Sequence, residues 1–264
     1  MRTVGWTPVI TAATAVAERA DGAGGMGSGT ARTAEPLAVV ADSAAVLALP
    51  GLGEELLTAV ERERAARFRR ERNRLDFVAA HLLVRLCAAR LLGIPAAAAT
   101  LVQHCPDCDL DGHGVPALAG RPEVRLSMSH TEGVVAAAAG PVPVGVDVEL
   151  LQTRGSLGDM HQRVLTDAES AAVAAHTDPA GAFLRQWVRK EAIIKIGRAT
   201  LDTLREVDLS ALPLDEPGPE PARHRHGDLH LVDLADRRRG VLAAVVSTAD
   251  VRIGTADVPF ADLG

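Results

Sequence analysis

Short apolar stretches bounded by turn residues recur along this chain and predict β-strands. They lie at 37–40, 123–129, 133–140, 143–150, 205–209, 228–233 and 241–247. Longer stretches with apolar residues at helical spacing predict helices at 54–93, 167–176 and 180–197. Segments 104–122 and 213–227 are rich in Gly, Pro and polar residues and are expected to be loops. Because helices and strands are mixed in both halves, the pattern predicts an α/β (α+β) fold.

Two acids and two valines alternate at 145–149. The side-chain period of a strand is 2, so Asp147 and Glu149 are expected on one face while Val146 and Val148 enter the core. An isolated Asp-x-Glu is more often a solvated pair on an edge strand. Apolar residues flank this strand on both sides, and charges so close to a core favour a functional pair.

A second polar stripe lies on the predicted helix at 180–197. Trp187, Glu191 and Lys195 are four residues apart and therefore share one helix face. Ordinary i,i+4 charge pairs are the plainer interpretation. Taken with Asp147 and Glu149, however, the stripe supplies carboxylate oxygens for a hard cation such as Mg²⁺, with a lysine beside it. Glu191 can be a third ligand or a proton acceptor.

Four motifs together resemble the 4′-phosphopantetheinyl transferases, in particular the Sfp-like branch. Gly-Val-Asp-Val-Glu at 145–149 and Trp-Val-Arg-Lys-Glu-Ala-Ile-Ile-Lys at 187–195 are similar to the signature pair of this family. Leu-Ser-Met-Ser-His-Thr at 126–131 is similar to its Ser-His segment, and Arg67-Phe68 followed by Arg85 is a weaker fourth match. The motifs run in family order, and the Trp/Lys-Glu/Lys element is the most specific. Usage rich in Ala, Arg and Gly is typical of a GC-rich, actinobacterial source.

The resemblance implies transfer of the 4′-phosphopantetheine arm of coenzyme A to a serine of an apo acyl or peptidyl carrier protein. It implies that Asp147, Glu149 and Glu191 bind Mg²⁺, with Mn²⁺ as an alternative, and that Glu191 deprotonates the serine directly or through a water. Lys195 would bind coenzyme A and stabilise the pyrophosphate as the arm leaves. We expect removal of Asp147 or Glu149 to lower turnover by orders of magnitude without lowering metal-free stability, because like charges would no longer repel.

Coenzyme A contacts are implied for Ser129 and for His130, the latter at the 3′-phosphate. A structural role is the plainer interpretation of His130 alone, and its place beside Ser129 favours the ligand role. Arg74 is the best further candidate in the arginine-rich segment 62–74, because it precedes His81 by two turns on the same helix face. Acids interleave with these arginines, so a solvated helix with i,i+4 pairs is the alternative for any one of them.

At two positions the sequence departs from the family pattern. Val115 stands where a basic residue is common in a Gly-Lys-Pro or Gly-Arg-Pro segment, and Asp76 stands where many members carry arginine. Both changes remove positive charge from the expected anion site. We therefore expect weak binding of coenzyme A, or phosphate contacts taken over by Arg121 and Arg125.

The resemblance also implies a pseudo-dimer of two similar α/β lobes with the active site in the cleft between them. The N-terminal lobe is expected at 36–145, the C-terminal lobe at 146–250, and a tail at 251–264. Residues 1–35, with low complexity around several glycines, are expected to form a disordered extension or a misassigned start.

The net charge of −6 argues against general affinity for nucleic acid. No apolar run approaches the roughly twenty residues of a membrane span, and the N-terminus lacks the pattern of a secretory signal. We therefore expect a cytoplasmic protein without membrane contact. We also expect a monomer. Resemblance to the branch favours carriers of polyketide or nonribosomal peptide synthesis.

Cys105 and Cys108 form a C-x-x-C flanked by His104 and His113, which is one possible zinc site. A structural zinc usually needs a second cysteine pair, and the third cysteine, Cys87, is expected in the core, so two reduced thiols are favoured. Other functions remain open. They are a catalytically inactive carrier-binding regulator on the same fold, a zinc-loop binding module, and a different Mg²⁺-dependent phosphohydrolase. The intact acids argue against the inactive regulator.

Overall fold

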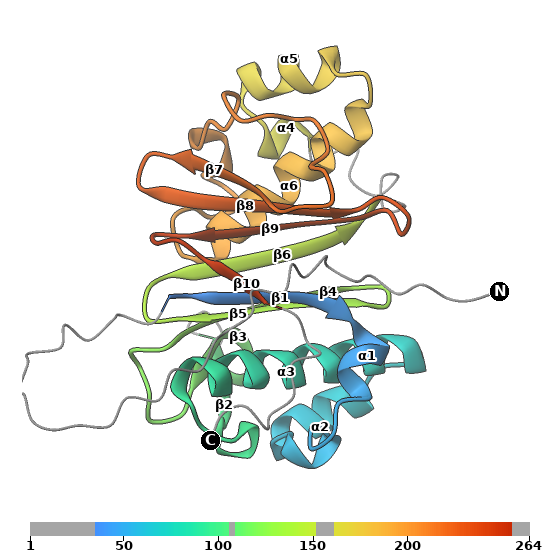
Figure 1. Cartoon of the computed structure of the whole chain (residues 1–264), viewed down its shortest axis with the longest axis vertical. Helices are drawn as coiled ribbons and strands as arrows, with labels where there is room; N and C mark the ends of the chain where they lie inside the picture. The colour runs from blue at the N-terminus through green and yellow to red at the C-terminus, as the bar shows by residue number, and fades with distance from the viewer. Residues whose placement is uncertain (1–34, 106–108, 152–160, 255–264) are drawn as a thin grey trace, which may run out of the picture.

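The computed structural model describes residues 35–105, 109–151 and 161–254. They form four layers in the order helix, sheet, sheet, helix (Figure 1). The first sheet has the order β10-β1-β5-β4, with β10 Arg252–Gly254, β1 Leu37–Asp42, β5 Val134–Gly140 and β4 Arg125–Thr131. The second has the order β6-β9-β8-β7, with β6 Val144–Leu150, β9 Val241–Ser247, β8 Leu229–Asp236 and β7 Ala222–His226. The predicted mixed α/β fold is confirmed.

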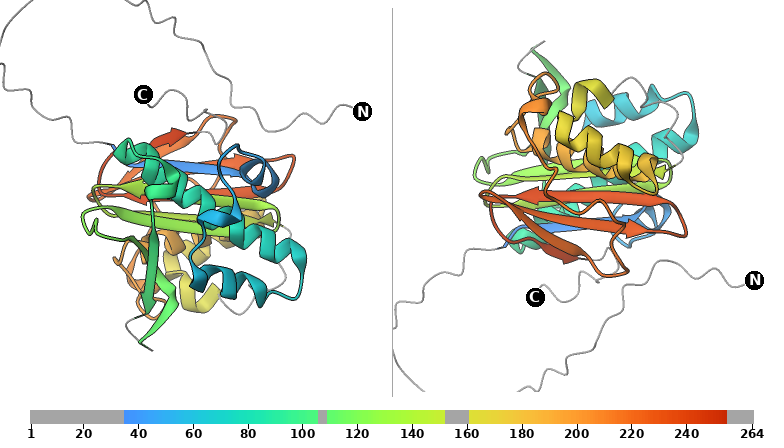
Figure 2. Two further views of the ribbon diagram at one scale, coloured as in Figure 1. Left: turned by 90° about the horizontal axis from the view of Figure 1, so that it is seen from below. Right: turned by 90° about the horizontal axis from the view of Figure 1, so that it is seen from above.

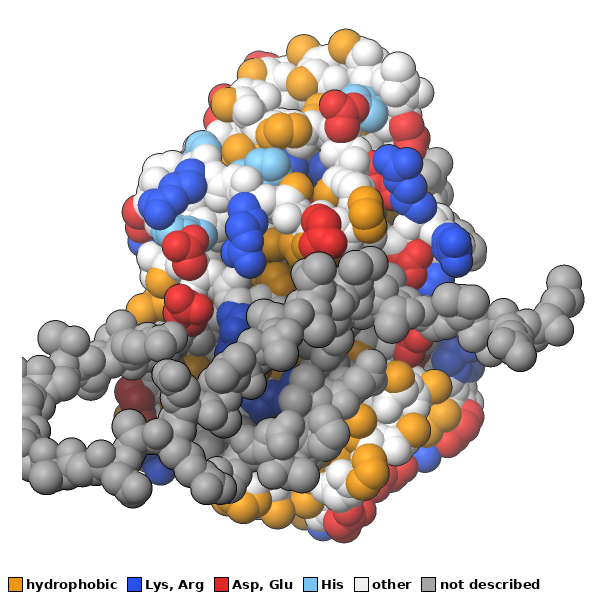
Figure 3. Space-filling view, in the orientation of Figure 1, with side chains coloured by type: hydrophobic (Ala, Val, Ile, Leu, Met, Phe, Trp, Pro, Cys, Tyr) orange, Lys and Arg blue, Asp and Glu red, His pale blue; other side chains and the backbone are white. Residues whose placement is uncertain are grey.

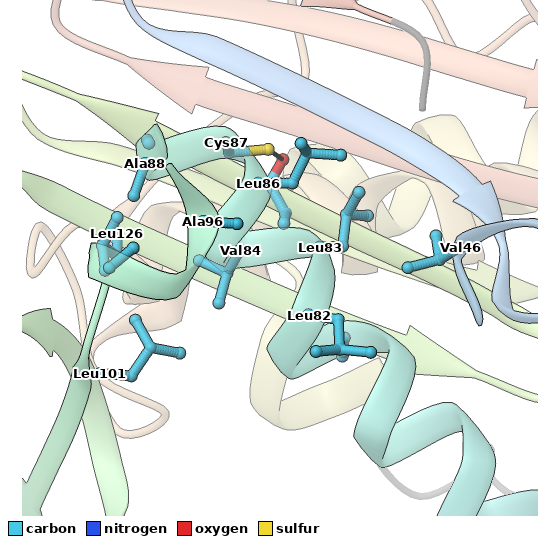
Figure 4. Packing of buried hydrophobic residues seen from close by; sticks show 14 of the residues in the cluster. Val46, Leu82, Leu83, Val84, Leu86, Cys87, Ala88, Ala96, Leu101 and Leu126 are labelled. Carbon is cyan, nitrogen blue, oxygen red and sulfur yellow. Dashed lines mark hydrogen bonds between the residues drawn. The ribbon is translucent and has the colours of Figure 1, made fainter. Parts of the chain in front are cut away.

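Strand β5 corresponds to the strand predicted at 133–140, whose sequence is a continuous apolar run. Val135, Ala137 and Ala139 pack against α3 Glu71–Leu92, and their alternating neighbours pack against the second sheet. Both faces are buried, so no polar position remains. Figure 4 shows the α3 side of this core, where Cys87 is buried and its Sγ donates to the Ala137 carbonyl at 3.7 Å. The core position predicted for Cys87 is confirmed.

Strand β6 alternates as its sequence predicts. Val146 and Val148 are fully buried between the two sheets, whereas Asp147 and Glu149 take the opposite face. That face lies against α6 Pro179–Lys195, which covers the outer side of the second sheet. Helix α6 begins with proline at its first turn, and the Asp178 carboxylate accepts the Gly181 N–H at 3.1 Å.

The single helix predicted at 54–93 is wrong in its boundaries. The segment divides into a 3₁₀ turn at Glu54–Leu56, helix α2 Ala59–Ala66 and α3. A capping box between Thr58 and Glu61 starts α2. The break between α2 and α3 contains neither Gly nor Pro, so apolar spacing alone does not reveal it.

Both predicted loops contain strands. The loop predicted at 104–122 overlaps β2 Leu101–Cys105 and contains β3 Leu110–Leu118, and these two strands form a separate hairpin that projects from the molecule (Figure 2). Gly112 and Gly114 in β3 have positive φ, and the register shifts opposite them, which a strand pattern does not anticipate. Within 213–227, Ala222–His226 form the edge strand β7. The strand predicted at 205–209 is instead a 3₁₀ turn at Leu204–Glu206.

Two short helices complete the outer layer over the second sheet: α4 His161–Val164 and α5 Asp167–Ala175. Helix α1 Ser43–Leu47 and a 3₁₀ turn at Ala96–Ala98 flank α3. Strand β10 returns from the second sheet and pairs in parallel with β1, so the tail predicted at 251–264 contributes a strand to the first sheet. The pseudo-dimer remains a prediction.

Several expectations fall outside the described residues. They are the extension predicted at 1–35, apart from its last residue, and the cysteine pair, of which Cys108 and the Cys105 side chain are not described. His104 is described and pairs with Asp109 and Asp111 on the hairpin. No helix within the described ranges is long and apolar enough to cross a membrane. Acidic and basic side chains are interspersed on the face shown in Figure 3, which gives that face no field of a single sign.

Candidate active site

The site predicted from the motifs lies where the two sheets meet. β4 and β6 are edge strands of different sheets and run close beside each other. The Val146 N–H donates to Ser127 Oγ at 3.0 Å, and Ser129 Oγ donates to Asp147 Oδ1 at 2.7 Å. The two strands are thus joined through hydroxyl groups of β4 and not by the backbone hydrogen bonds of a single sheet. We call this junction of β4 and β6 the seam.

Lys195, the last residue of α6, reaches into the seam. Its Nζ donates to Asp147 Oδ1 at 2.7 Å, to the Val146 carbonyl at 2.9 Å and to the Met128 carbonyl at 3.4 Å. An ammonium has three protons, and these acceptors engage all of them. Lys195 therefore bridges both sheets, while one quarter of its side chain remains exposed.

The three predicted metal ligands share one electrostatic environment. Burial, followed by the charges of Asp147 and Glu191, raises the pKa of Glu149 to about 7, although Lys195 opposes the shift. Burial and Asp147 likewise raise the pKa of Glu191. Asp147 is buried, and its Oδ2 has no hydrogen-bond partner among the residues described. A buried carboxylate oxygen without a hydrogen-bond partner, beside two further acids, could accept a contact from a cation.

These residues suit a hard divalent cation in charge and in donor atoms. As they stand, however, no three Asp, Glu, His or Cys side chains in the described ranges converge closely enough to hold a metal. Glu149 and Glu191 are half-buried, and Asp147 Oδ1 is engaged by Lys195 and Ser129. Metal binding therefore requires side-chain rotation within this set.

Pairing with Lys195 changes one expectation. Asp147 is ion-paired, so its removal does not simply relieve repulsion between like charges. Glu149 has no ion pair in the described part of the chain, and the expectation of equal or higher metal-free stability stays a prediction for Glu149 alone.

Glu149 should make the stability of the metal-free protein depend on pH. Folding raises its pKa from 4.5 to about 7, so the folded state retains a proton that the unfolded chain has lost. This stabilisation is fully present below the unfolded pKa and disappears as pH rises through about 7. We expect the metal-free Tm to fall between about pH 5 and 8, and Glu149→Gln to reduce that fall, leaving the part due to Glu191. A wild-type Tm that rises over this range would contradict the assignment.

His130 lies on β4, on the first-sheet side of the seam, and its side chain is exposed. Desolvation by neighbouring atoms lowers its pKa most, and the charges of Lys195 and Arg64 add to this, while Asp76 opposes it. The predicted coenzyme A residues Ser129 and His130 therefore lie beside Lys195, as the motifs suggest.

Arg64 on α2 is one of the arginines in segment 62–74. Its guanidinium donates to the Gly112 carbonyl and lies 5.4 Å from the centre of the Phe77 ring. Arg64 therefore links α2 to the projecting hairpin, and its charge also acts on His130. Sequence spacing alone does not distinguish it from its neighbours.

Arg74 is bound to two acids instead. Its guanidinium pairs with Glu54 and Glu71, both at 2.9 Å, and these contacts raise its pKa above the ordinary value. His81, used to place Arg74 on a ligand-binding face, is buried and hydrogen-bonds the Phe77 carbonyl. A coenzyme A contact by Arg74 stays a prediction, and it would require exchange of these partners.

The two departures from the family pattern have different surroundings. Val115 is 67% exposed on β3, so no packing requirement explains the valine. Asp76 is buried on α3. Arg121 and Arg125 are exposed, and Arg121 lies 3.7 Å from Glu123.

Comparison with known proteins supports the motif assignment. No curated protein matches the chain. Residues 143–246 match the family model described as the 4′-phosphopantetheinyl transferase superfamily. This segment runs from β6 to β9 and contains Asp147, Glu149, Glu191 and Lys195. The chain therefore carries a transferase domain of the 4′-phosphopantetheinyl transferase superfamily at residues 143–246.

Proposed function

We propose that this protein transfers the 4′-phosphopantetheine arm of coenzyme A to a serine of an apo acyl or peptidyl carrier protein and releases adenosine 3′,5′-bisphosphate. The observation that carries the proposal is the cluster of Asp147, Glu149 and Glu191 beside Lys195 at the seam, within the matched segment. Three acids and one cation on rigid elements suit chemistry on a phosphorylated substrate.

Asp147, Glu149 and Glu191 would hold Mg²⁺ or Mn²⁺. When bound, such an ion supplies positive charge that neutralises the pyrophosphate of coenzyme A. Burial and the charge of Asp147 raise the pKa of Glu149 and of Glu191, and a bound cation would counteract the repulsion between these acids.

Glu191 is the proposed proton acceptor. The serine oxygen forms a bond to the phosphorus that carries pantetheine, and the bond from that phosphorus to the bridging oxygen breaks. The serine proton passes to Glu191. A carboxylate whose pKa is raised by burial is a better base near neutral pH than an exposed one.

Lys195 would stabilise the departing phosphate. In the structure its protons are held by Asp147 and two carbonyl groups, so it must exchange at least one acceptor when coenzyme A binds. Ser129, His130 and Arg64 would contact the coenzyme A phosphates, with Arg74 as a further candidate.

The carrier would approach from the side of α2. Arg67, Arg69 and Arg70 lie exposed between α2 and α3 and form no ion pair with any described residue, which suits an acidic partner. We propose a cytoplasmic monomer that acts on polyketide or nonribosomal peptide carriers. A catalytically inactive carrier-binding regulator is the alternative, and the crowded acids at the seam argue against it.

Mass spectrometry of an apo carrier protein incubated with coenzyme A and Mg²⁺ tests the function. The carrier should gain one phosphopantetheine group, and adenosine 3′,5′-bisphosphate should appear in equal amount. A carrier with its acceptor serine replaced by alanine is the control and should gain nothing. Binding of apo carrier without any gain in mass would identify the inactive regulator instead.

A further inference from the structure

Asp76 is a buried carboxylate on α3 that no described lysine or arginine neutralises, and only 3% of its surface is exposed. Burying an uncompensated charge is costly, so its retention requires specific partners. Ser43 Oγ donates to Asp76 Oδ1 at 2.5 Å, and the Gly133 N–H lies 3.1 and 3.2 Å from the two carboxylate oxygens.

These contacts fix the turn between β4 and β5. Gly133 belongs to this turn, has a φ of +76° and also accepts the Ser43 N–H at 3.0 Å. Asp76, Ser43 and Gly133 thus form a closed set of hydrogen bonds that joins α3, the start of α1 and the turn. An exposed ion pair between Arg72 and Glu132 adds a second link from α3.

The turn directly follows the end of β4, which carries His130. The negative charge of Asp76 raises the pKa of His130, against desolvation and against the cations Lys195 and Arg64. Without this carboxylate the imidazole would be both less firmly placed and less often protonated. A neutral imidazole attracts a phosphate much less strongly than an imidazolium.

We propose that Asp76 is a positioning residue for phosphate recognition: by fixing the β4–β5 turn it places His130 where, together with Arg64, it binds the 3′-phosphate of coenzyme A. This rests on the proposed function. Asp76 itself does not contact the substrate.

Comparison of coenzyme A with dephospho-coenzyme A, which lacks the 3′-phosphate, tests the inference in the full chain. Asp76→Asn keeps the size and one acceptor oxygen but removes the charge. It should lower kcat/KM for coenzyme A by about fivefold, mainly through KM, and leave dephospho-coenzyme A nearly unchanged. A general loss of structure would lower both equally. The NMR titration of the His130 ring should move to lower pH in the same variant.

Ser43→Ala is the matched control, because it removes one hydrogen bond but leaves the carboxylate and its contact with the Gly133 N–H in place; it should retain the preference for coenzyme A. In a His130→Ala background, Asp76→Asn should cause no further change of preference. An unchanged preference together with an unchanged His130 titration in folded Asp76→Asn would overturn the inference. If that variant does not fold, Gly133→Ala disturbs the turn through its positive φ and should lower the preference; a retained preference would likewise overturn it.

If wild type transfers nothing, the proposed function fails. The inference is then decided by the affinities of wild type and Asp76→Asn for adenosine 3′,5′-bisphosphate and for adenosine 5′-phosphate. The inference is supported if Asp76→Asn binds adenosine 3′,5′-bisphosphate more weakly than wild type does but binds adenosine 5′-phosphate equally well. It is rejected if the two proteins have the same affinities for both ligands.

Discussion

Asp147→Asn is expected to lower the rate of phosphopantetheine transfer by at least about a hundredfold. Asparagine retains an oxygen that can accept from Ser129 and Lys195, so the seam should keep its geometry. The negative charge that would attract a cation is lost. Steady-state transfer to an apo carrier at several Mg²⁺ concentrations measures the effect, and partial recovery at high Mg²⁺ is expected.

Glu149→Gln is the matched variant from the same face of β6. It too should lower transfer, but it should raise the metal-free Tm above pH 7, because Glu149 is not paired with Lys195. Turnover close to wild type in Asp147→Asn would rule out Asp147 as a ligand.

Lys190→Ala is expected to reduce the free energy of unfolding by about 3–5 kcal/mol. The Lys190 Nζ lies 2.7 Å from Glu169 Oε2, and both side chains are fully buried. Three carbonyl groups, those of Val164, Leu204 and Val207, accept its protons. Removal of the lysine leaves the Glu169 charge and these carbonyls without a cation. Urea unfolding followed by circular dichroism measures the loss.

Two controls test the cause of that loss. Lys190→Met combined with Glu169→Gln removes both charges of this buried pair and should recover part of the stability. Arg163→Ala removes an exposed pair with Asp202 and should change stability by less than about 1 kcal/mol. A loss of that small size in Lys190→Ala would show that the buried pair contributes little.

Lys190 also shows what the motifs do not reveal. It lies within the Trp-x-x-Lys-Glu element, next to Glu191, yet it faces the interior and holds α6 to the turn at Leu204–Glu206. Residue type and spacing place a lysine on the helix, but its partners come from backbone carbonyls far away in the chain. The same is true of Lys195, whose carbonyl acceptors belong to two different sheets.

The alternation of apolar and acidic residues predicts β6 well because the two faces of this strand have different surroundings. Val146 lies in the core between the sheets, and Asp147 lies on the opposite face at the seam. It fails for the β2–β3 hairpin, where glycines with positive φ interrupt the pattern. It also fails at β7, because arginines and histidines on an edge strand resemble a polar loop. Asp76 illustrates a third limit, since its partners Ser43 and Gly133 are distant in sequence.

Pairing of Leu37 with Arg252 places the two ends of the described chain in adjacent strands. During synthesis β1 leaves the ribosome before every other described element, and β10, its partner on that side, emerges after all of them. Until then the edge of β1 is open to other extended segments. During synthesis the first sheet can therefore be completed only after β10 has emerged, because β10 is the described strand that covers this edge of β1.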